Sequence, residues 1–421
     1  MAQSQPQQQR ILVIGAGFAG MWSAISARRL LSLESKNEAA SSIEVALVSP
    51  EDNLVIRPRL YEPDLANTSV PLGELFAATG VRYIQGTVDT IHTAGHEVTV
   101  VDAAGNRSTI AYTRLVLAAG SRLVRPNLPG LEEHAFNIDQ FKEAVDVEKH
   151  LQGLAKLPPS PARNTVVVCG GGFTGIELAT ELPARLQAAL GNDEKVRVVV
   201  VERAQDIGPD LGPGPRPVIL EAMEKLGVEM KLGTAVVSVD ANGVVTADGE
   251  RIEALTTVWT AGMVANPLTK QIPGEKDRLG RIHVDGNLRV PSAPDVFATG
   301  DTAYAMTEGD KHPAMMSCQH AMYLGRFSGH NAAADLLNVP LKQYAQARYA
   351  TCLDLGSAGS VVCQGWDRQV IMTGEQGKKV KTYINRVLIY PPKADEEDAF
   401  VRADPNWQAP ALDMSLLAGA C

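Results

Sequence analysis

Two stretches of the chain repeat the same order of apolar and polar positions. Each begins with a short aliphatic run, passes through a glycine-rich turn of the form GxGxxG, and continues with apolar residues at helical spacing. A second aliphatic run follows each helical pattern. In the first stretch, the run with its turn covers residues 10–20, the helical pattern 21–31, and the second run 43–48. In the second stretch, the same parts cover residues 164–175, 176–182 and 196–201. We therefore predict two strand–turn–helix–strand units within an α/β fold.

Both glycine-rich turns have the form that cradles the pyrophosphate of a dinucleotide. The first glycine permits a tight turn, the second lets the backbone approach the phosphates, and the third allows the helix to pack closely on the strand. The helix adds its free N–H groups and the positive end of its dipole. The candidate contacts are Gly15, Gly17, Phe18, Ala19 and Gly20 in the first turn, and Gly170, Gly172, Phe173, Thr174 and Gly175 in the second. Two such sites are typical of enzymes that pass a hydride from a nicotinamide to a flavin.

The residue that ends the second strand of each unit helps to assign the two nucleotides. In the second unit it is Glu202, whose carboxylate would accept hydrogen bonds from a ribose diol and repel a 2′-phosphate, so NADH is favoured over NADPH. Arg203 follows directly and weakens this preference. In the first unit the residue is Ser49, where an acid would be expected. Glu51 or Asp52 could take its place at the ribose.

Composition and charge narrow the range of partners. The 421 residues include 39 basic and 48 acidic side chains, a net charge of −9 that disfavours a nucleic-acid binder. No apolar run approaches the ~18 residues of a spanning helix, and the polar start of the chain resembles neither a signal nor a transit peptide. Five scattered cysteines without a CxxC pair, and histidine pairs without a third ligand, predict no disulfides, no dithiol site and no metal. We expect a cytoplasmic protein, with weak contact to a membrane surface left open.

Three segments of the chain resemble the flavoprotein superfamily with two dinucleotide-binding domains. They are GAGFAG at 15–20, LVLAAGS at 115–121 and DVFATGD at 295–301. The resemblance implies non-covalently bound FAD, with Gly300 and Asp301 at its ribityl chain or pyrophosphate, and Ala119 and Gly120 at a turn beside it. It also implies two Rossmann-like domains, the NAD(P)H domain inserted in the FAD domain, and a C-terminal α+β domain.

Within this superfamily the chain is most similar to type II NADH dehydrogenases, the single-subunit NADH:quinone oxidoreductases. Residues 170–179 resemble their GGGPTGVELA segment. A strand end of the form W-x-A-G would place Ala261 and Gly262 at the NADH site. Arg57 and Pro58 begin the segment that corresponds to the Q-P-L-L-Y motif of these enzymes, which implies a position beside FAD. Residues 318–325 resemble their quinone-site helix, A-Q-x-A-x-Q-x-G. The similarity covers roughly residues 10–345 and implies NADH, FAD and a quinone-like acceptor.

Three residues are candidates for the chemistry. The resemblance puts Glu177, in the first turn of the second helix, near the contact of nicotinamide and flavin, where it would orient the nicotinamide or relay protons. The alternative is an acid that only serves the helix dipole. Gln319 begins a helix predicted from about 316 to 337 and would contact FAD and the acceptor. Tyr323 lies one turn further, either at the acceptor or in the core beside the flavin.

The similarity is weaker on the acceptor side. Tyr323 stands in place of the second glutamine of the quinone motif, Cys318 replaces its first alanine, and the usual C-terminal amphipathic membrane helix is not evident. Residues 378–390 could form a short interfacial helix, an ordinary solvated helix or a strand of the C-terminal domain. Two other functions stay open: a soluble reductase for oxygen, a small aromatic substrate or an electron-carrier protein, and a redox-switch flavoprotein resembling apoptosis-inducing factor.

These patterns divide the chain into three domains. We expect an FAD domain at 8–125 and 274–345, an NAD(P)H domain at 126–273, and a C-terminal domain at 346–421 that covers the flavin and contributes to a homodimer. In this scheme NADH reduces FAD, which then passes two electrons to a quinone-like acceptor.

Overall fold

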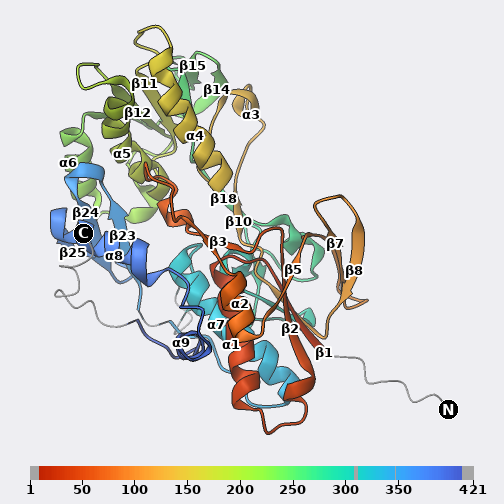
Figure 1. Ribbon diagram of the computed structural model, residues 1–421. Helices are drawn as coiled ribbons and strands as arrows, with labels where there is room; N and C mark the ends of the chain where they lie inside the picture. The colour runs from red at the N-terminus through yellow and green to blue at the C-terminus, as the bar shows by residue number, and fades with distance from the viewer. Residues whose placement is uncertain (1–8, 308–311, 347, 410–421) are drawn as a thin grey trace.

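The computed structural model describes residues 9–307, 312–346 and 348–409. A first α/β unit carries the N-terminal strand, a second α/β unit lies at the top of Figure 1, and a small C-terminal sheet lies at the left of that view. The α/β fold class predicted from the sequence is confirmed.

The first unit is built on a six-stranded sheet with the order β20-β21-β9-β1-β2-β5. Its inner pairs are parallel, whereas β20 is antiparallel to β21. The strands are β1 (Gln9–Ile14), β2 (Ile43–Ser49), β5 (Arg82–Gln85), β9 (Arg114–Leu117), β20 (Arg289–Val290) and β21 (Ala293–Ala298). Because successive side chains of a strand point to opposite faces, β1 contributes Ile11 and Val13 to one apolar layer, and Leu12 and Ile14 to the other.

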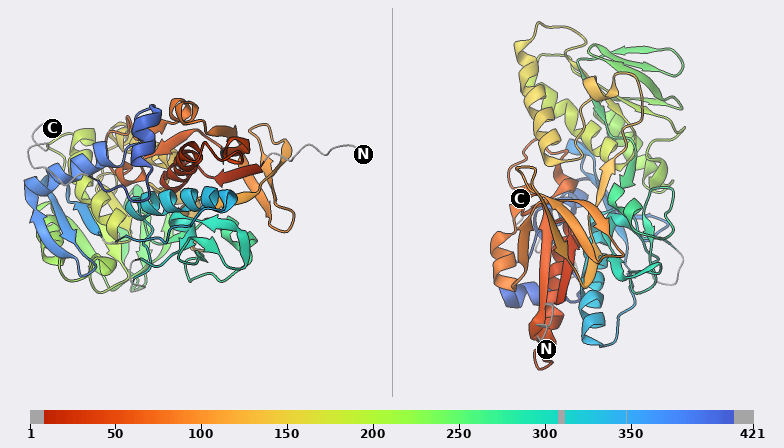
Figure 2. Two further views of the ribbon diagram at one scale, coloured as in Figure 1. Left: turned by 90° about the horizontal axis from the view of Figure 1, so that it is seen from below. Right: turned by 90° about the vertical axis from the view of Figure 1, so that its right-hand side faces the viewer.

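Two helices from distant parts of the chain cover one face of this sheet. Helix α1 (Phe18–Leu33) and helix α7 (Cys318–Leu337) lie side by side (Figure 2). Their backbones come so close that a Cβ on Gly329 would lie 1.9 Å from the carbonyl oxygen of Ser23. The sheet β6 (Thr87–His92), β7 (Glu97–Val101) and β8 (Arg107–Ala111) covers the other face. The glycine-rich turn before α1 is thereby held at the carboxyl edge of the parallel strands.

The second unit repeats this architecture. Its four-stranded parallel sheet has the order β13-β12-β11-β17, with β11 (Thr165–Cys169), β12 (Arg197–Glu202), β13 (Val228–Leu232) and β17 (Thr256–Trp259). One apolar layer joins it to α4 (Phe141–Gly153), α5 (Phe173–Leu190) and α6 (Arg216–Lys225). The opposite layer joins it to β14 (Val236–Asp240), β15 (Gly243–Thr246) and β16 (Arg251–Glu253). Both predicted strand–turn–helix–strand units are therefore present.

The two units are connected by a pair of short strands. Strand β10 (Ser121–Leu123) lies where the chain leaves the first unit, and it pairs antiparallel with β18 (Met263–Ala265), where the chain returns. Other short strands are β3 (Asn53–Val55) with β4 (Ser69–Pro71), and β19 (Ile282–His283) with β22 (Ala303–Tyr304).

The C-terminal region forms a three-stranded antiparallel sheet of β23 (Ala350–Asp354), β24 (Ser360–Gln364) and β25 (Gln369–Thr373). Helix α8 (Gly374–Tyr383) packs on it and continues into a π-helical turn, Ile384–Leu388. Residues 378–390 are therefore neither a strand nor an ordinary solvated helix, since Val380 and Lys381 of α8 are buried. Helix α9 (Glu396–Arg402) packs against α1 and α2 (Gly73–Thr79).

Most predicted helix bounds are close to those observed, with one exception. The helix predicted at 316–337 is α7, Cys318–Leu337. The pattern at 176–182 stops where Pro183 follows, yet α5 runs through this proline to Leu190. Proline removes one backbone donor from a helix interior. The buried Leu182 and Leu186 on either side of it keep the helix packed in the second unit.

Candidate nucleotide sites and the ion pair beside them

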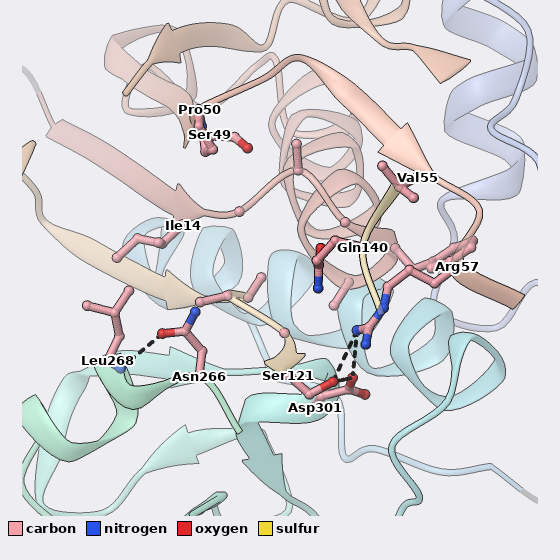
Figure 3. Close-up of a pocket in the computed structure, with 18 of the residues that line it drawn as sticks. Ile14, Ser49, Pro50, Val55, Arg57, Ser121, Gln140, Asn266, Leu268 and Asp301 are labelled. Carbon is pink, nitrogen blue, oxygen red and sulfur yellow. Dashed lines mark hydrogen bonds and ion pairs between the residues drawn. The ribbon is translucent and has the colours of Figure 1, made fainter. Parts of the chain in front are cut away.

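A cavity of about 920 Å³ opens at the carboxyl edge of the first sheet (Figure 3). Ten of the predicted FAD residues lie in its wall: Gly15, Gly17, Phe18, Ala19, Ser49, Arg57, Pro58, Ala119, Gly120 and Asp301. Gly20, Gly300 and Gln319 do not. A Cβ on Gly20 would lie 1.8 Å from the carbonyl oxygen of Gly15, and one on Gly300 would lie 2.7 Å from the Cβ of Ala19. These two glycines thus permit close packing behind the cavity.

The first turn has the geometry that a pyrophosphate needs. Gly15 has φ +105°, and a Cβ there would lie 2.5 Å from the carbonyl oxygen of Ala118, so only glycine fits. Gly17 faces open space, with nothing within 4 Å of where its Cβ would be. No side chain caps the N-terminus of α1, so its first N–H groups are free to donate to an anion. The residues present therefore fit a bound dinucleotide.

The end of β2 distinguishes between the two acids that could replace Ser49. Glu51 lies in the cavity wall together with Ser49. Asp52 does not, because its carboxylate lies instead near Gly73 at the start of α2. Of the two acids, Glu51 is therefore the one that lines this cavity.

A charged network crosses from the cavity to the second unit. The Ser121 hydroxyl donates to Asp301 (2.6 Å), and Arg57 donates to that hydroxyl (3.1 Å) while its guanidinium lies 3.9 Å from the Asp301 carboxylate. Arg57 also forms an ion pair with Asp139, which precedes α4. Burial raises the pKa of Asp301, and the Arg57 charge opposes that shift. Arg57 thus joins the two units at the cavity.

The second glycine turn has the same construction. Gly170 has φ +117°, and its missing Cβ would lie 3.0 Å from Ala261. Gly172 faces open space, and a Cβ on Gly175 would lie 1.8 Å from the carbonyl oxygen of Gly170. The N-terminus of α5 carries no side-chain cap. Gly262, with φ +82°, follows Ala261 where the chain turns toward β18.

Glu202 is held against the second turn by two backbone donors. Its carboxylate accepts hydrogen bonds from the amide of Gly171 (2.7 Å) and the amide of Ala204 (2.8 Å). The negative charge therefore lies at the edge of the glycine turn, where a ribose would lie and a 2′-phosphate would be repelled. Thr174 lines a second cavity of about 60 Å³, whose wall also includes Arg57 and Asp139.

Glu177 lies in a buried ion pair. Its carboxylate is 2.7 Å from the Lys381 ammonium, and the side chains are 4% and 6% exposed. The amide of Asp354 donates a further hydrogen bond to Glu177 (3.0 Å). Burial raises the pKa of Glu177 to about 7, with Lys381 opposing the shift and the Asp354 charge adding to it. Burial would lower the pKa of Lys381, but the groups that face it, Glu177 first among them, together outweigh burial and the pKa is raised.

Lys381 was not among the residues predicted from the sequence. The sequence carries only a weak indication that Lys381 is buried. This lysine shares the i, i+3, i+4, i+7 spacing of one helix face with Gly377, Val380 and Ile384. A lysine in that stripe has to find a partner in the interior. The ammonium also lies 5.6 Å from the ring centroid of Phe173, at the start of α5.

Gln319 and Tyr323 do not line the large cavity. The Gln319 side chain reaches the C-terminal sheet, where it accepts from the amide of Ala350 (3.5 Å). The Tyr323 hydroxyl donates to Gln408 (3.5 Å). The α7 residues in the cavity wall are Cys318 and Ala321. Burial raises the pKa of the Cys318 thiol to about 11, which keeps it neutral. A role of Gln319 and Tyr323 at the flavin or the acceptor stays a prediction.

Comparison with known proteins decides the family. Residues 9–325 match the family described as pyridine nucleotide-disulphide oxidoreductase. The chain belongs to this family. Membership of the pyridine nucleotide-disulphide oxidoreductases implies the use of a flavin and a nicotinamide nucleotide, which agrees with the two glycine turns.

Several curated members of the family align with most of the chain. A NADH dehydrogenase-like protein of Mycobacterium tuberculosis is 43% identical over 402 residues, covering 95% of this chain and 99% of the relative. The type II NADH:quinone oxidoreductase Ndh of the same organism is 27% identical, covering 76% and 72%. The demethylphylloquinone reductase of Synechocystis is 25% identical, covering 84% and 86%.

Solved structures share the fold of this chain. The NDH2 of Plasmodium falciparum in complex with NADH has a TM-score of 0.73 at 14% identity, covering 94% of this chain and 98% of that one. The sulfide:quinone oxidoreductase of Aquifex aeolicus has a TM-score of 0.71 at 19% identity, covering 90% of each chain. Among the residues that the structure describes, no helix is long and apolar enough to cross a membrane.

Proposed function

We propose that the chain is an FAD-dependent NADH oxidoreductase that passes electrons to a quinone-like acceptor. The observation that carries the proposal is that Arg57 lines both the cavity of the first glycine turn and the small cavity beside Thr174 of the second. The two nucleotide sites would therefore meet at Arg57, and hydride transfer needs such contact. Relatives named as NADH:quinone and demethylphylloquinone reductases support the acceptor class.

Each part of the chain has a task in this proposal. Bound FAD would supply the redox chemistry, taking a hydride from NADH and giving two electrons to the acceptor. The first turn would hold its pyrophosphate, Glu51 the ribose, and the Ser121–Asp301 pair the ribityl side. Because Cys318 and Ala321 line the cavity, α7 begins at its wall, and the positive end of the helix favours negative charge there. Gln319 and Tyr323 remain the proposed residues on the acceptor side.

Two carboxylates would determine which coenzyme is preferred and which residue holds the proton. Glu202 would accept from the NADH ribose, which favours NADH over NADPH. Oxidation of NADH by a quinone consumes one proton, and Glu177 is suited to hold it because its pKa of about 7 lies near neutral pH. Lys381 keeps this carboxylate oriented at 2.7 Å.

The test combines a cofactor assay, a rapid-reaction experiment and an acceptor screen. Purified protein should release FAD on denaturation, and NADH should bleach its flavin faster than NADPH does. A soluble quinone should then sustain turnover better than oxygen or an electron-carrier protein. We expect Glu177→Gln to keep its flavin but slow quinone turnover about 100-fold, the lower end of what a positioned acid–base group contributes.

The control is Glu229→Gln, at a half-exposed glutamate of β13 that pairs with Arg197. A protein without flavin, or a flavin that NADH does not reduce, would refute the proposed function. Rapid flavin reduction without turnover on any acceptor would favour the redox switch instead.

A further inference from the structure

Glu177 and Lys381 belong to a larger group of buried charges. This carboxylate–lysine cluster consists of Glu177 and Glu181 from α5, Asp354 from the end of β23, and Lys378 and Lys381 from α8. Three segments far apart in the sequence thus bring five ionisable side chains together at one junction. A buried ion pair often adds little to stability, because the cost of removing two charges from water offsets their attraction, so a buried network of this size needs another explanation.

The contacts run from the interior toward the surface. Glu177 accepts from the amide of Asp354, and the Asp354 carboxylate accepts from the Tyr61 hydroxyl (2.9 Å) and from the Lys378 ammonium (2.5 Å). Lys378 also lies 3.2 Å from Glu181. Lys381 donates to the carbonyl of Cys352, two residues before Asp354 on the same strand (3.1 Å).

Exposure increases along the same direction. The side chains of Glu177, Lys381 and Asp354 are 4%, 6% and 5% exposed. Those of Glu181 and Lys378 are 18% and 34% exposed. Water therefore reaches the cluster at Lys378 and Glu181, whereas Glu177 has no direct access to it.

The charges leave the cluster one proton short of neutrality. Three carboxylates and two ammonium groups carry one excess negative charge when all are ionised. Burial raises the pKa of Glu177 to about 7 and also raises that of Glu181, while the facing carboxylates raise the pKa of both lysines against the effect of burial.

The other titratable groups that face the cluster do not supply the missing charge. The Tyr61 hydroxyl and the Cys352 thiol face Glu177, and burial raises the pKa of both, that of Cys352 to about 11. The Cys318 thiol faces Lys381 and is likewise neutral. Arg185 faces Glu181 but is paired with Glu148.

We propose that Asp354 and Lys378 form the proton-exchange route between Glu177 and solvent. The inference rests on the proposed function, in which Glu177 holds the proton consumed in turnover. NADH, one proton and a quinone give NAD⁺ and a quinol, so one proton must enter from water in each cycle. Lys378 gives a proton to Asp354 and takes one from water, and Asp354 passes its proton on to Glu177, the carboxylate to which its own backbone amide donates. Only O–H and N–H bonds are exchanged.

The test uses the full-length, flavin-loaded protein with Asp354→Asn, Lys378→Met and Glu177→Gln. Lys379→Met is the matched control, because Lys379 lies next to Lys378 on the same helix, has a similar exposure of 41%, and pairs with Glu375 outside the cluster. We expect Asp354→Asn and Lys378→Met to reduce quinone turnover about tenfold at alkaline pH, and a small diffusible acid or amine added to the buffer to restore it. Lys379→Met should behave as wild type.

A second readout does not depend on turnover. The infrared band of the protonated Glu177 carboxyl, identified by its loss in Glu177→Gln, should titrate at lower pH in Asp354→Asn, because the repulsion by the Asp354 charge is gone. Slow variants that no added buffer rescues, or a band whose midpoint does not move, would overturn the route.

The two hypotheses fail in different ways. If Glu177→Gln slows turnover while Asp354→Asn and Lys378→Met behave as wild type, only the exchange route is wrong. If Glu177→Gln itself is unaffected, the proton role in the proposed function is wrong. If Asp354→Asn does not fold, Lys378→Met still tests the route, because the Lys378 side chain is partly exposed and its replacement disturbs the interior less.

Discussion

Removing the Lys381 charge should make the stability of the protein depend on pH in a defined way. In the wild type the pKa of Glu177 is about 7 in the folded protein, against 4.5 ordinarily. The folded state therefore binds more protons than the unfolded state across this interval, and the free energy of unfolding falls as pH rises through it. The loss from Glu177 is about 3 kcal/mol, at ~1.4 kcal/mol for each pKa unit, and it is complete above pH 7.

Lys381→Met removes the attraction that holds this pKa down. The pKa of Glu177 then moves above 7, so the decline in stability continues to higher pH instead of ending there. Between about pH 7 and about pH 9 the variant should lose up to ~3 kcal/mol more than the wild type, since each pH unit contributes ~1.4 kcal/mol. At about pH 5 Glu177 is protonated in both folded proteins, so only the pH-independent cost of losing other Lys381 contacts, such as that to the Cys352 carbonyl, remains between them. Lys381 titrates above this window because its own pKa is raised.

The assay is urea unfolding followed by fluorescence at several pH values. The double variant Lys381→Met with Glu177→Gln should lose the added pH dependence, because no carboxylate is left to titrate at this position. Lys379→Met should follow the wild-type curve. A cost of Lys381→Met that is the same at about pH 5 and about pH 9 would refute the reasoning.

Three further predictions concern the nucleotide sites. Gly17→Val would fill the open space that a pyrophosphate needs, so the purified protein should lack flavin absorbance; a fully flavinated variant would contradict the assignment. Glu202→Ala removes the charge that repels a 2′-phosphate and should raise kcat/KM for NADPH relative to NADH by about tenfold or more, and an unchanged ratio would count against this role. Arg57→Gln leaves Asp139 and Asp301 without their cationic partner, so we expect a more negative flavin reduction potential by dye-linked titration, and a potential equal to that of the wild type would exclude an electrostatic role of Arg57.

The glycine turns could be predicted because the signals that define them are local. The tight turn at Gly15 and the close helix–strand packing at Gly20 both follow from neighbours in one short segment. The sheet pairing of each unit follows from the aliphatic runs, which are buried on both faces.

The ion pair could not be predicted in the same way. Glu177 and Lys381 lie in different domains of the expected scheme, and no local pattern links them. The lysine stripe on α8 shows only that a buried cation needs a partner, not which one. The predicted end of helix α5 at residue 182 is too early for a related reason. The continuation of the helix beyond Pro183 depends on packing in the second unit rather than on helix propensity.

The close contact of α1 with α7 has a consequence for how the chain is made. The first sheet receives β20 and β21 only after residue 288, and its first helix packs against α7, which comes later still. The strands and helices of the second unit, from α4 to β17, are contiguous in the sequence. A ribosome therefore releases every strand and helix of the second unit before the first sheet is complete, and the C-terminal sheet adds Leu353 and Val361 to the core of the second unit later. We expect the second unit to fold first during synthesis, and the cavity at the first glycine turn to be completed only when α7 docks on α1.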